Sequence, residues 1–128
     1  MVKGSPGTRG MEPPLSPAIF HILLALAAGE MHGYAIMQEI AILSDGRVHL
    51  GPGTLYGSIK RLLAARLIEE SEDRPDPELD DERRRYYRLT QEGHRVLTAE
   101  AERLQHLVRA ARARKVVGNV PALRLGKV

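Results

Sequence analysis

Apolar residues recur every three to four positions in several segments of the chain, a spacing typical of helices that bury one face. In the first of these segments, Ser16 is a good N-cap and Pro17 suits the first helical position. We therefore expect a helix that starts at Pro17 and ends by Gly29. Its apolar face consists of Ile19, Ile22, Leu23 and Leu26.

Two more segments continue the helical pattern. The second predicted helix runs from about Gly33 to Ser44. The turn Gly51-Pro52-Gly53 follows, and Thr54 is a suitable N-cap for a third helix that ends near Ala65. The two apolar stripes are Ile36, Met37, Ile40 and Leu43, then Leu55, Ile59, Leu62 and Leu63. The other side of the third helix is expected to carry Thr54, Gly57, Ser58, Lys60 and Arg61.

A short hairpin is predicted after the third helix. Residues 67–70 and 84–89 indicate two antiparallel strands, because aromatic and branched side chains favour strands. A long acidic loop with two prolines joins them. Tyr86 and Tyr87 alternate across the second strand, so one of the two rings is expected to point inward.

A long final helix is predicted from Gln91 to about Lys115, with Thr90 as its cap. So small a domain offers this helix too few partners, so we expect its apolar stripe to pair with a second copy of the chain. The stripe is Leu97, Ala101, Leu104, Val108 and Ala111. The expected organisation is a flexible leader at 1–14, a folded domain at 15–90, a dimerisation helix at 91–116 and a flexible basic tail at 117–128.

Composition excludes several classes of protein. The length of 128 residues fits one domain. The absence of Cys excludes disulfides and thiolate sites and fits the cytoplasm, where we expect the protein. Its longest apolar stretch is too short to span a membrane. The five histidines lack metal-ligand spacing, and no phosphate loop or catalytic triad pattern is apparent, so we expect no metal, no cofactor and no enzyme.

Charge is distributed unevenly along the chain. Residues 69–82 hold nine of the 16 acidic residues and one Arg, and the other 114 residues carry a net charge of +11. Such a field favours a polyanionic partner, most commonly nucleic acid. From charge alone, a solvated surface of mixed charge is the alternative.

The predicted order of three helices, a hairpin and a long helix indicates a winged helix-turn-helix protein, mainly α with a small β-hairpin, plus a long C-terminal dimerisation helix. In this fold the third helix enters the major groove of double-stranded DNA, which is about 12 Å wide. Gly57 keeps the outer face of that helix low. We expect DNA contacts from the third helix and the returning strand, at Thr54, Tyr56, Ser58, Lys60, Arg61, Arg83, Arg84, Arg85 and Arg88.

Five motifs occur in a characteristic order: His32-Gly33-Tyr34, Gly53-Thr54-Leu55-Tyr56, Lys60-Arg61-Leu62, Leu67-Ile68 and Tyr86 to Gly93. Together they resemble the PadR family of bacterial transcriptional regulators, over about residues 15–96. The resemblance implies a winged-helix fold and a homodimer formed by the C-terminal helix. It also implies repression at a palindromic operator. In this family repression is often relieved by a small molecule or another signal, and for this chain that effector is unknown. The chain lacks Trp, so the stacking of flat ligands between tryptophans seen in some members is not available.

Two departures from the family pattern leave alternatives open. Gly57 stands where the family often has Pro, and the hairpin tip is long and acidic. Because phosphates would repel that tip, we expect the arginines at its base to contact DNA, or else to neutralise Asp80, Asp81 and Glu82. The alternative function is a protein-interaction module that docks through the acidic tip. The small, basic outer face of the third helix favours DNA binding.

Overall fold

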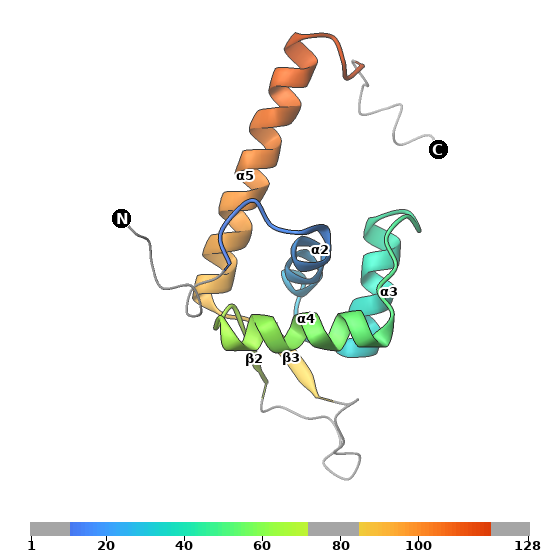
Figure 1. Cartoon of the computed structure of the whole chain (residues 1–128), viewed down its shortest axis with the longest axis vertical. Coiled ribbons are helices and arrows are strands. Elements are labelled where there is room, and N and C mark those ends of the chain that lie inside the picture. The colour runs from blue at the N-terminus through green and yellow to red at the C-terminus, as the bar shows by residue number, and fades with distance from the viewer. Residues whose placement is uncertain (1–10, 72–84, 119–128) are drawn as a thin grey trace.

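Figure 1 shows the fold of the chain as a computed structural model, which describes residues 11–71 and 85–118. Within these ranges the chain forms four helices and three short strands. In chain order they are α2 (Pro17–Leu26), β1 (Met31–His32), α3 (Gly33–Leu43), α4 (Pro52–Ala64), β2 (Ile68–Glu70), β3 (Tyr86–Leu89) and α5 (Gln91–Ala113). This order confirms the predicted winged helix-turn-helix architecture, mainly helical with a small antiparallel sheet.

Two helices begin at the caps predicted from the sequence. The Ser16 hydroxyl accepts a hydrogen bond from the Ile19 N–H at 3.2 Å, at the start of α2. The Thr90 hydroxyl accepts one from the Gly93 N–H at 2.9 Å, at the start of α5. Each cap satisfies a backbone donor that has no partner inside the helix.

The helix α3 begins at Gly33 as predicted, with a cap that was not predicted, whereas α4 begins earlier than predicted. At α3 the cap is His32, whose Nδ1 accepts a hydrogen bond from the Ala35 N–H at 3.2 Å. At α4 the N-cap is Gly51 and the helix starts at Pro52, so Thr54 lies inside the first turn. The prediction of Thr54 as the cap is wrong, because Pro52 has no N–H to satisfy and its fixed φ suits the first helical position.

The sheet contains one strand that the sequence analysis missed. Its order is β1-β3-β2, with β3 antiparallel to both neighbours. The predicted pairing of β2 with β3 is confirmed, in a register that places Ile68 opposite Leu89 and Glu69 opposite Arg88. The added strand β1 has two residues, with His32 opposite Tyr86. The predicted hairpin tip lies outside the described residues.

The core is built around α2, which lies between α3, α4 and α5 (Figure 1). Tyr87 points inward and is 5% exposed, whereas the Tyr86 ring meets the His32 ring edge-on with centroids 5.3 Å apart. This confirms the predicted alternation of the two tyrosines. The buried side chains of the helices are Ile19, Ile22, Leu23, Ala25 and Leu26 of α2, Ile36 and Ile40 of α3, Leu55, Ile59 and Leu62 of α4, and Val96 and Leu97 of α5.

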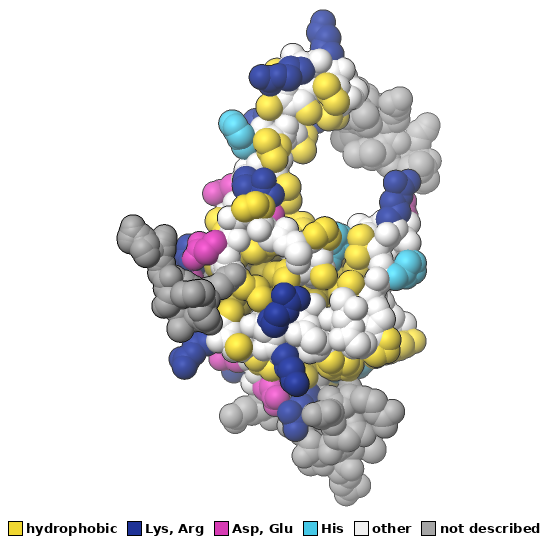
Figure 2. Space-filling model, in the orientation of Figure 1, with side chains coloured by type: hydrophobic (Ala, Val, Ile, Leu, Met, Phe, Trp, Pro, Cys, Tyr) yellow, Lys and Arg dark blue, Asp and Glu magenta, His cyan; other side chains and the backbone are white. Residues whose placement is uncertain are grey.

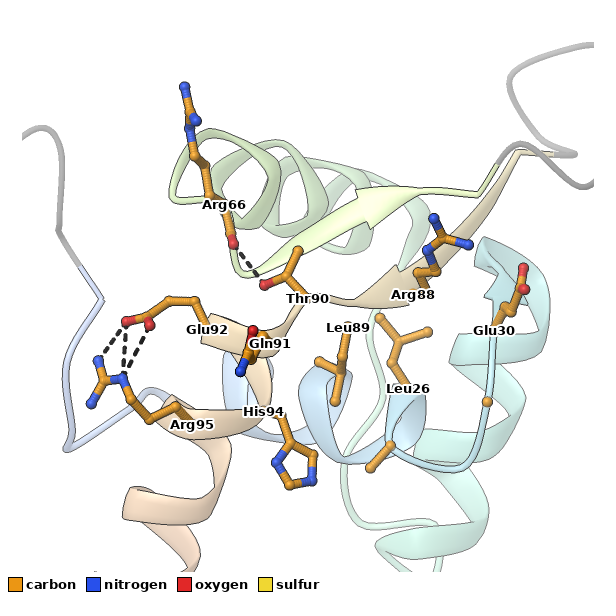
Figure 3. Close-up of a pocket in the computed structure, with 12 residues that line it drawn as sticks. Leu26, Glu30, Arg66, Arg88, Leu89, Thr90, Gln91, Glu92, His94 and Arg95 are labelled. Carbon is orange, nitrogen blue, oxygen red and sulfur yellow. Dashed lines mark hydrogen bonds and ion pairs between the residues drawn. The ribbon is translucent and has the colours of Figure 1, made fainter.

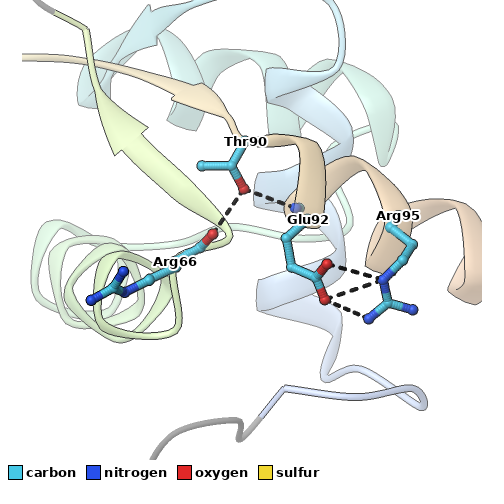
Figure 4. A network of polar contacts seen from close by, with 5 residues as sticks. Arg66, Thr90, Glu92 and Arg95 are labelled. Carbon is cyan, nitrogen blue, oxygen red and sulfur yellow. Dashed lines mark hydrogen bonds and ion pairs between the residues drawn. The ribbon is translucent and has the colours of Figure 1, made fainter.

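The start of α5 is fixed against the end of α4. The Thr90 hydroxyl also donates a hydrogen bond to the Arg66 carbonyl at 2.8 Å (Figure 4). In addition, the Thr90 N–H donates to the Leu67 carbonyl at 3.0 Å. A Cβ at Gly93 would collide with the Leu67 carbonyl. The close approach of these two backbones therefore requires glycine at this position, because any side chain would force them apart.

The packed part of the chain begins earlier than predicted. Met11 and Leu15 pack against the core, so at least residues 11–14 are not a loose leader. At the other end, α5 has 23 residues, and its C-terminal half extends away from the other elements (Figure 1). Among the described residues, no helix has the length and apolar character needed to cross a membrane.

Candidate nucleic-acid interface

The outer face of α4 is small and flanked by cations. Successive residues of a helix are about 100° apart, which places Gly57 at the middle of this face, with Lys60 on one flank and Arg61 on the other. Apart from the backbone of α4 itself and the two chain neighbours, nothing would lie within 4 Å of a Cβ at Gly57, so this part of the helix is open to solvent. The exposed residues are Gly53, Thr54, Gly57, Lys60, Arg61 and Ala64.

The basic side chains over α4 are set within a largely uncharged surface (Figure 2). A flat backbone surface with cations at its edges can approach a polyanion closely, because no large side chain holds it away. The geometry therefore suits insertion into a groove lined by phosphates.

Ser58 does not belong to this face, and its prediction as a DNA contact is corrected. The side chain is 1% exposed, and its hydroxyl accepts a hydrogen bond from Arg61 Nη2 at 3.4 Å. Its polar character suggested the outer face, but Ser58 lies three residues after Leu55 and four before Leu62, so helical geometry turns it toward the core. The hydroxyl positions the Arg61 guanidinium from beneath.

Tyr56 has a packing role that the sequence did not reveal. The side chain is half-buried, and a Cβ at Gly33 would collide with its ring and hydroxyl. Gly33 is the first residue of α3, so the Tyr56 ring fixes the spacing between α3 and α4. A phosphate contact from the Tyr56 hydroxyl stays a prediction.

The two described hairpin arginines lie on opposite sides of the hairpin. Arg85, the residue before β3, lies on the inner side with Tyr87, and Arg88 within β3 lies on the outer side, because side chains of an extended chain alternate. Each arginine is paired with a glutamate: Arg85 Nη1 lies 3.1 Å from Glu70 Oε2, and Arg88 Nε lies 2.8 Å from Glu69 Oε2. The predicted contacts Arg83 and Arg84 fall outside the described residues, as does the acidic tip.

The inner arginine lines a groove between α4 and the hairpin. This groove has a volume of about 320 Å³. Its lining residues are Tyr56, Ile59, Lys60, Leu63, Glu70, Arg85 and Tyr87. Arg85 and Lys60 were predicted as DNA contacts on two separate elements, and the fold brings both to the rim of this groove.

A larger and more open groove of about 1040 Å³ lies on the outer side of the sheet, where α2 ends and α5 begins. Arg66, Arg88, His94 and Arg95 line it, and their side chains extend in different directions (Figure 3). Arg95 is paired with Glu92, as both close-up views show (Figures 3 and 4). These charges do not converge on one point, so the groove offers no focused binding site.

The apolar stripe of α5 divides into a covered and an uncovered part. Leu97 is 6% exposed and belongs to the core of its own chain, so its prediction as a dimer contact is corrected. Further along, Ala101 and Val108 are exposed, and Leu104 and Ala111 are half-buried. Leu107 was not part of the predicted stripe, but it is 50% exposed and lies three residues after Leu104, on the same side of the helix.

A buried carboxylate lies where the two parts of the stripe meet. Glu100 is 2% exposed, and its oxygens accept hydrogen bonds from Arg103 Nε at 2.7 Å, Arg103 Nη2 at 3.0 Å and the Leu15 N–H at 3.0 Å. The Arg103 guanidinium, helped by the Leu15 N–H, lowers the pKa of Glu100 although burial opposes this. Glu100 therefore fastens the N-terminal segment to α5.

These features define a winged helix-turn-helix protein whose third helix has an open, basic face. The family model of PadR-like transcriptional regulators matches residues 22–99, which is more than half of the chain. The chain therefore belongs to the PadR-like family, whose members are transcriptional regulators and not enzymes.

Two solved structures share the fold. A transcriptional regulator from Clostridium thermocellum is 26% identical with a TM-score of 0.60, over 75% of this chain and 87% of that one. A PadR family regulator from Clostridium difficile R20291 is 22% identical with a TM-score of 0.62, over 77% of this chain and 97% of that one.

A relative from a transposon is much longer. An uncharacterised 37.1 kDa protein of transposon Tn4556 from Streptomyces fradiae is 40% identical over 86 residues, which are 67% of this chain. The match spans 22% of the length of that relative.

The variant Glu100→Gln tests the carboxylate that joins α5 to the N-terminal segment. Because the pKa of Glu100 is lowered in the folded protein, its charge stabilises the fold above the ordinary carboxyl pKa, and this effect is lost as the pH falls through the lowered value. We expect the variant to lose about 2 kcal/mol of unfolding free energy near pH 7. Urea unfolding should show this loss shrinking towards pH 3.

The matched control is Glu92→Gln. Glu92 pairs with Arg95 at the same three-residue spacing as Glu100 with Arg103, but both partners are exposed to solvent. We expect little change in stability, since water screens such pairs. Equal losses in the two variants would show that burial of Glu100 does not matter.

Proposed function

We propose that the protein is a sequence-specific DNA-binding repressor that acts as a homodimer on a palindromic operator. The observation that carries this proposal is the outer face of α4, where small residues lie between Lys60 and Arg61 beside the hairpin. In winged-helix proteins the corresponding helix enters the major groove. Membership of a family of transcriptional regulators supports the same function.

The exposed part of the α5 stripe supports a homodimer. On its C-terminal half, Leu107 is 50% exposed and Val108 is 44% exposed. Both lie on the side of α5 that packs against the domain in the first turns of the helix. Burying these side chains against a second copy removes apolar surface from water. A two-fold dimer presents two α4 helices, which calls for an operator with two inverted half-sites.

The DNA-binding test begins with selection of genomic fragments by the wild-type protein, followed by affinity measurements over a range of salt concentrations. We expect affinity to fall steeply with salt, because neutralised phosphates release counterions. Replacing both Lys60 and Arg61 by Ala should lower operator affinity at least tenfold. It should also lower the slope of log affinity against log salt by about 0.9 or more.

The control replaces Arg109 and Arg112 by Ala. These exposed residues of α5 carry the same total charge and lie away from α4. We expect this variant to keep most of the operator affinity. Equal losses in the two double variants would mean that only the net charge matters and that α4 does not contact the operator.

Leu104→Asp tests the dimer. A carboxylate in the middle of the stripe would have to be buried without a partner, which is costly. We expect the wild-type protein to sediment as a dimer. The variant should sediment as a monomer at the same concentration, with an unchanged circular dichroism spectrum.

His106→Asp provides the matched control, because His106 is exposed and lies on the opposite side of α5. It should remain dimeric. A Leu104→Asp protein that sediments as the wild-type dimer would exclude this interface.

A further inference from the structure

The groove between α4 and the hairpin has an apolar floor and a charged rim. Ile59, Leu63 and Tyr87 form the floor, while Lys60 and Arg85 bring two positive charges and Glu70 one negative charge. The three charges sum to +1. One singly charged anion balances this sum, and a phosphodiester of a nucleic acid backbone carries one negative charge.

The fold brings Lys60 and Arg85 to this groove from segments that are far apart in sequence. Tyr56, Lys60 and Leu63 follow helical spacing along the flank of α4 that lines the groove. Arg85 directly precedes β3 and lines the groove together with the buried Tyr87 of that strand. Both cations are thus carried by elements that the core holds in place.

Arg85 has donor capacity that the described residues do not use. Its Nη1 binds Glu70 at 3.1 Å, whereas its Nε is buried and has no acceptor among the described residues. A buried N–H without an acceptor is energetically costly and rare in folded proteins. The Arg85 side chain as a whole is 40% exposed, so an oxygen that enters the groove from outside can reach its remaining Nη donors.

Lys60 complements this arrangement. It is exposed and forms no ion pair with any other described residue. A lysine ammonium acts on phosphate as a compact point charge, whereas arginine binds phosphate oxygens through its planar fork of N–H donors. One of each at a groove can hold a single phosphate from two sides.

We propose that Lys60 of α4 and Arg85 of the hairpin hold the same backbone phosphate of bound DNA, and that Glu70 orients Arg85 for this contact. This proposal rests on the proposed function. It means that the DNA backbone passes between α4 and the hairpin, with one strand held at the rim while α4 lies in the major groove. This pair of contacts, here called the clamp, fixes how deeply α4 enters the major groove and is independent of base sequence.

Arg88 provides an internal control. It lies three residues beyond Arg85, within β3, and is also paired with a glutamate, but it belongs to the outer side and lines the other groove. Under the proposal, Arg85 and Lys60 are coupled, and Arg88 is coupled to neither.

The test is a double-mutant cycle on the operator selected by the wild-type protein, with Lys60→Ala, Arg85→Ala and the two together. Because one phosphate is lost in total, we expect the double variant to lower the salt slope by about 0.9, where two separate phosphates would give about 1.8. The loss of affinity in the double variant should be smaller than the product of the single losses. The losses of affinity from Arg88→Ala and Lys60→Ala should instead multiply when the two changes are combined.

A second variant keeps the proposal testable if the Arg85→Ala protein does not fold. Replacing both Glu70 and Arg85 by Gln keeps the side chains long and the net charge constant. We expect operator affinity to fall about tenfold although the net charge is unchanged, with the circular dichroism spectrum of the wild type. Unchanged affinity in this folded variant would overturn the proposal.

The outcomes separate the clamp from the proposed function. If the wild-type protein selects no DNA, the proposed function fails. If it binds an operator but the two slope changes add to about 1.8, or Lys60→Ala is coupled to Arg88→Ala as strongly as to Arg85→Ala, the clamp is wrong and the function stands. Release of the operator by millimolar inorganic phosphate at constant ionic strength would assign the groove to free phosphate and overturn the proposal.

Discussion

Burial of α2 is the constraint on which the rest of the structure depends. The helices α3, α4 and α5 and the strand β3 all pack against it, and Ile22 and Leu23 have no exposed surface. Because α4 buries Leu55 and Leu62 in the same core, its small face can only point outward. The position of the candidate interface therefore follows from apolar packing, and the charged residues are placed by it.

The same packing makes α5 a helix with two roles. Its first turns bury Leu97 in the domain, and the same side of the helix continues beyond the domain with Leu107 and Val108 exposed. Glu100 lies between these two parts, where it holds the N-terminal segment. Under the proposed function, this continuity transmits the orientation of α4 to the dimer and so sets the distance between two half-sites.

Much of the fold could be predicted from local chemistry, whereas the features that depend on contacts between distant segments could not. Caps such as Ser16 and Thr90 act on neighbouring backbone donors, so their helix starts could be predicted. The strand β1 has two residues and no periodicity to detect. The polarity of Ser58 predicts an exposed side chain, but its helical position places it in the core. Leu97 belongs to the core although the apolar stripe continues past it without a break. The glutamate partners of the hairpin arginines depend on strand register, which residue pattern alone does not define.

The most direct test of the account is the operator affinity of Gly57→Leu. Gly57 lies at the middle of the α4 face, where an added side chain meets open space, and leucine favours the helix more than glycine does. The account predicts a dimer at least as stable as the wild type that binds the operator at least tenfold more weakly, because the side chain holds α4 out of the groove. Wild-type affinity in that stable variant would contradict the claim that this face of α4 enters DNA.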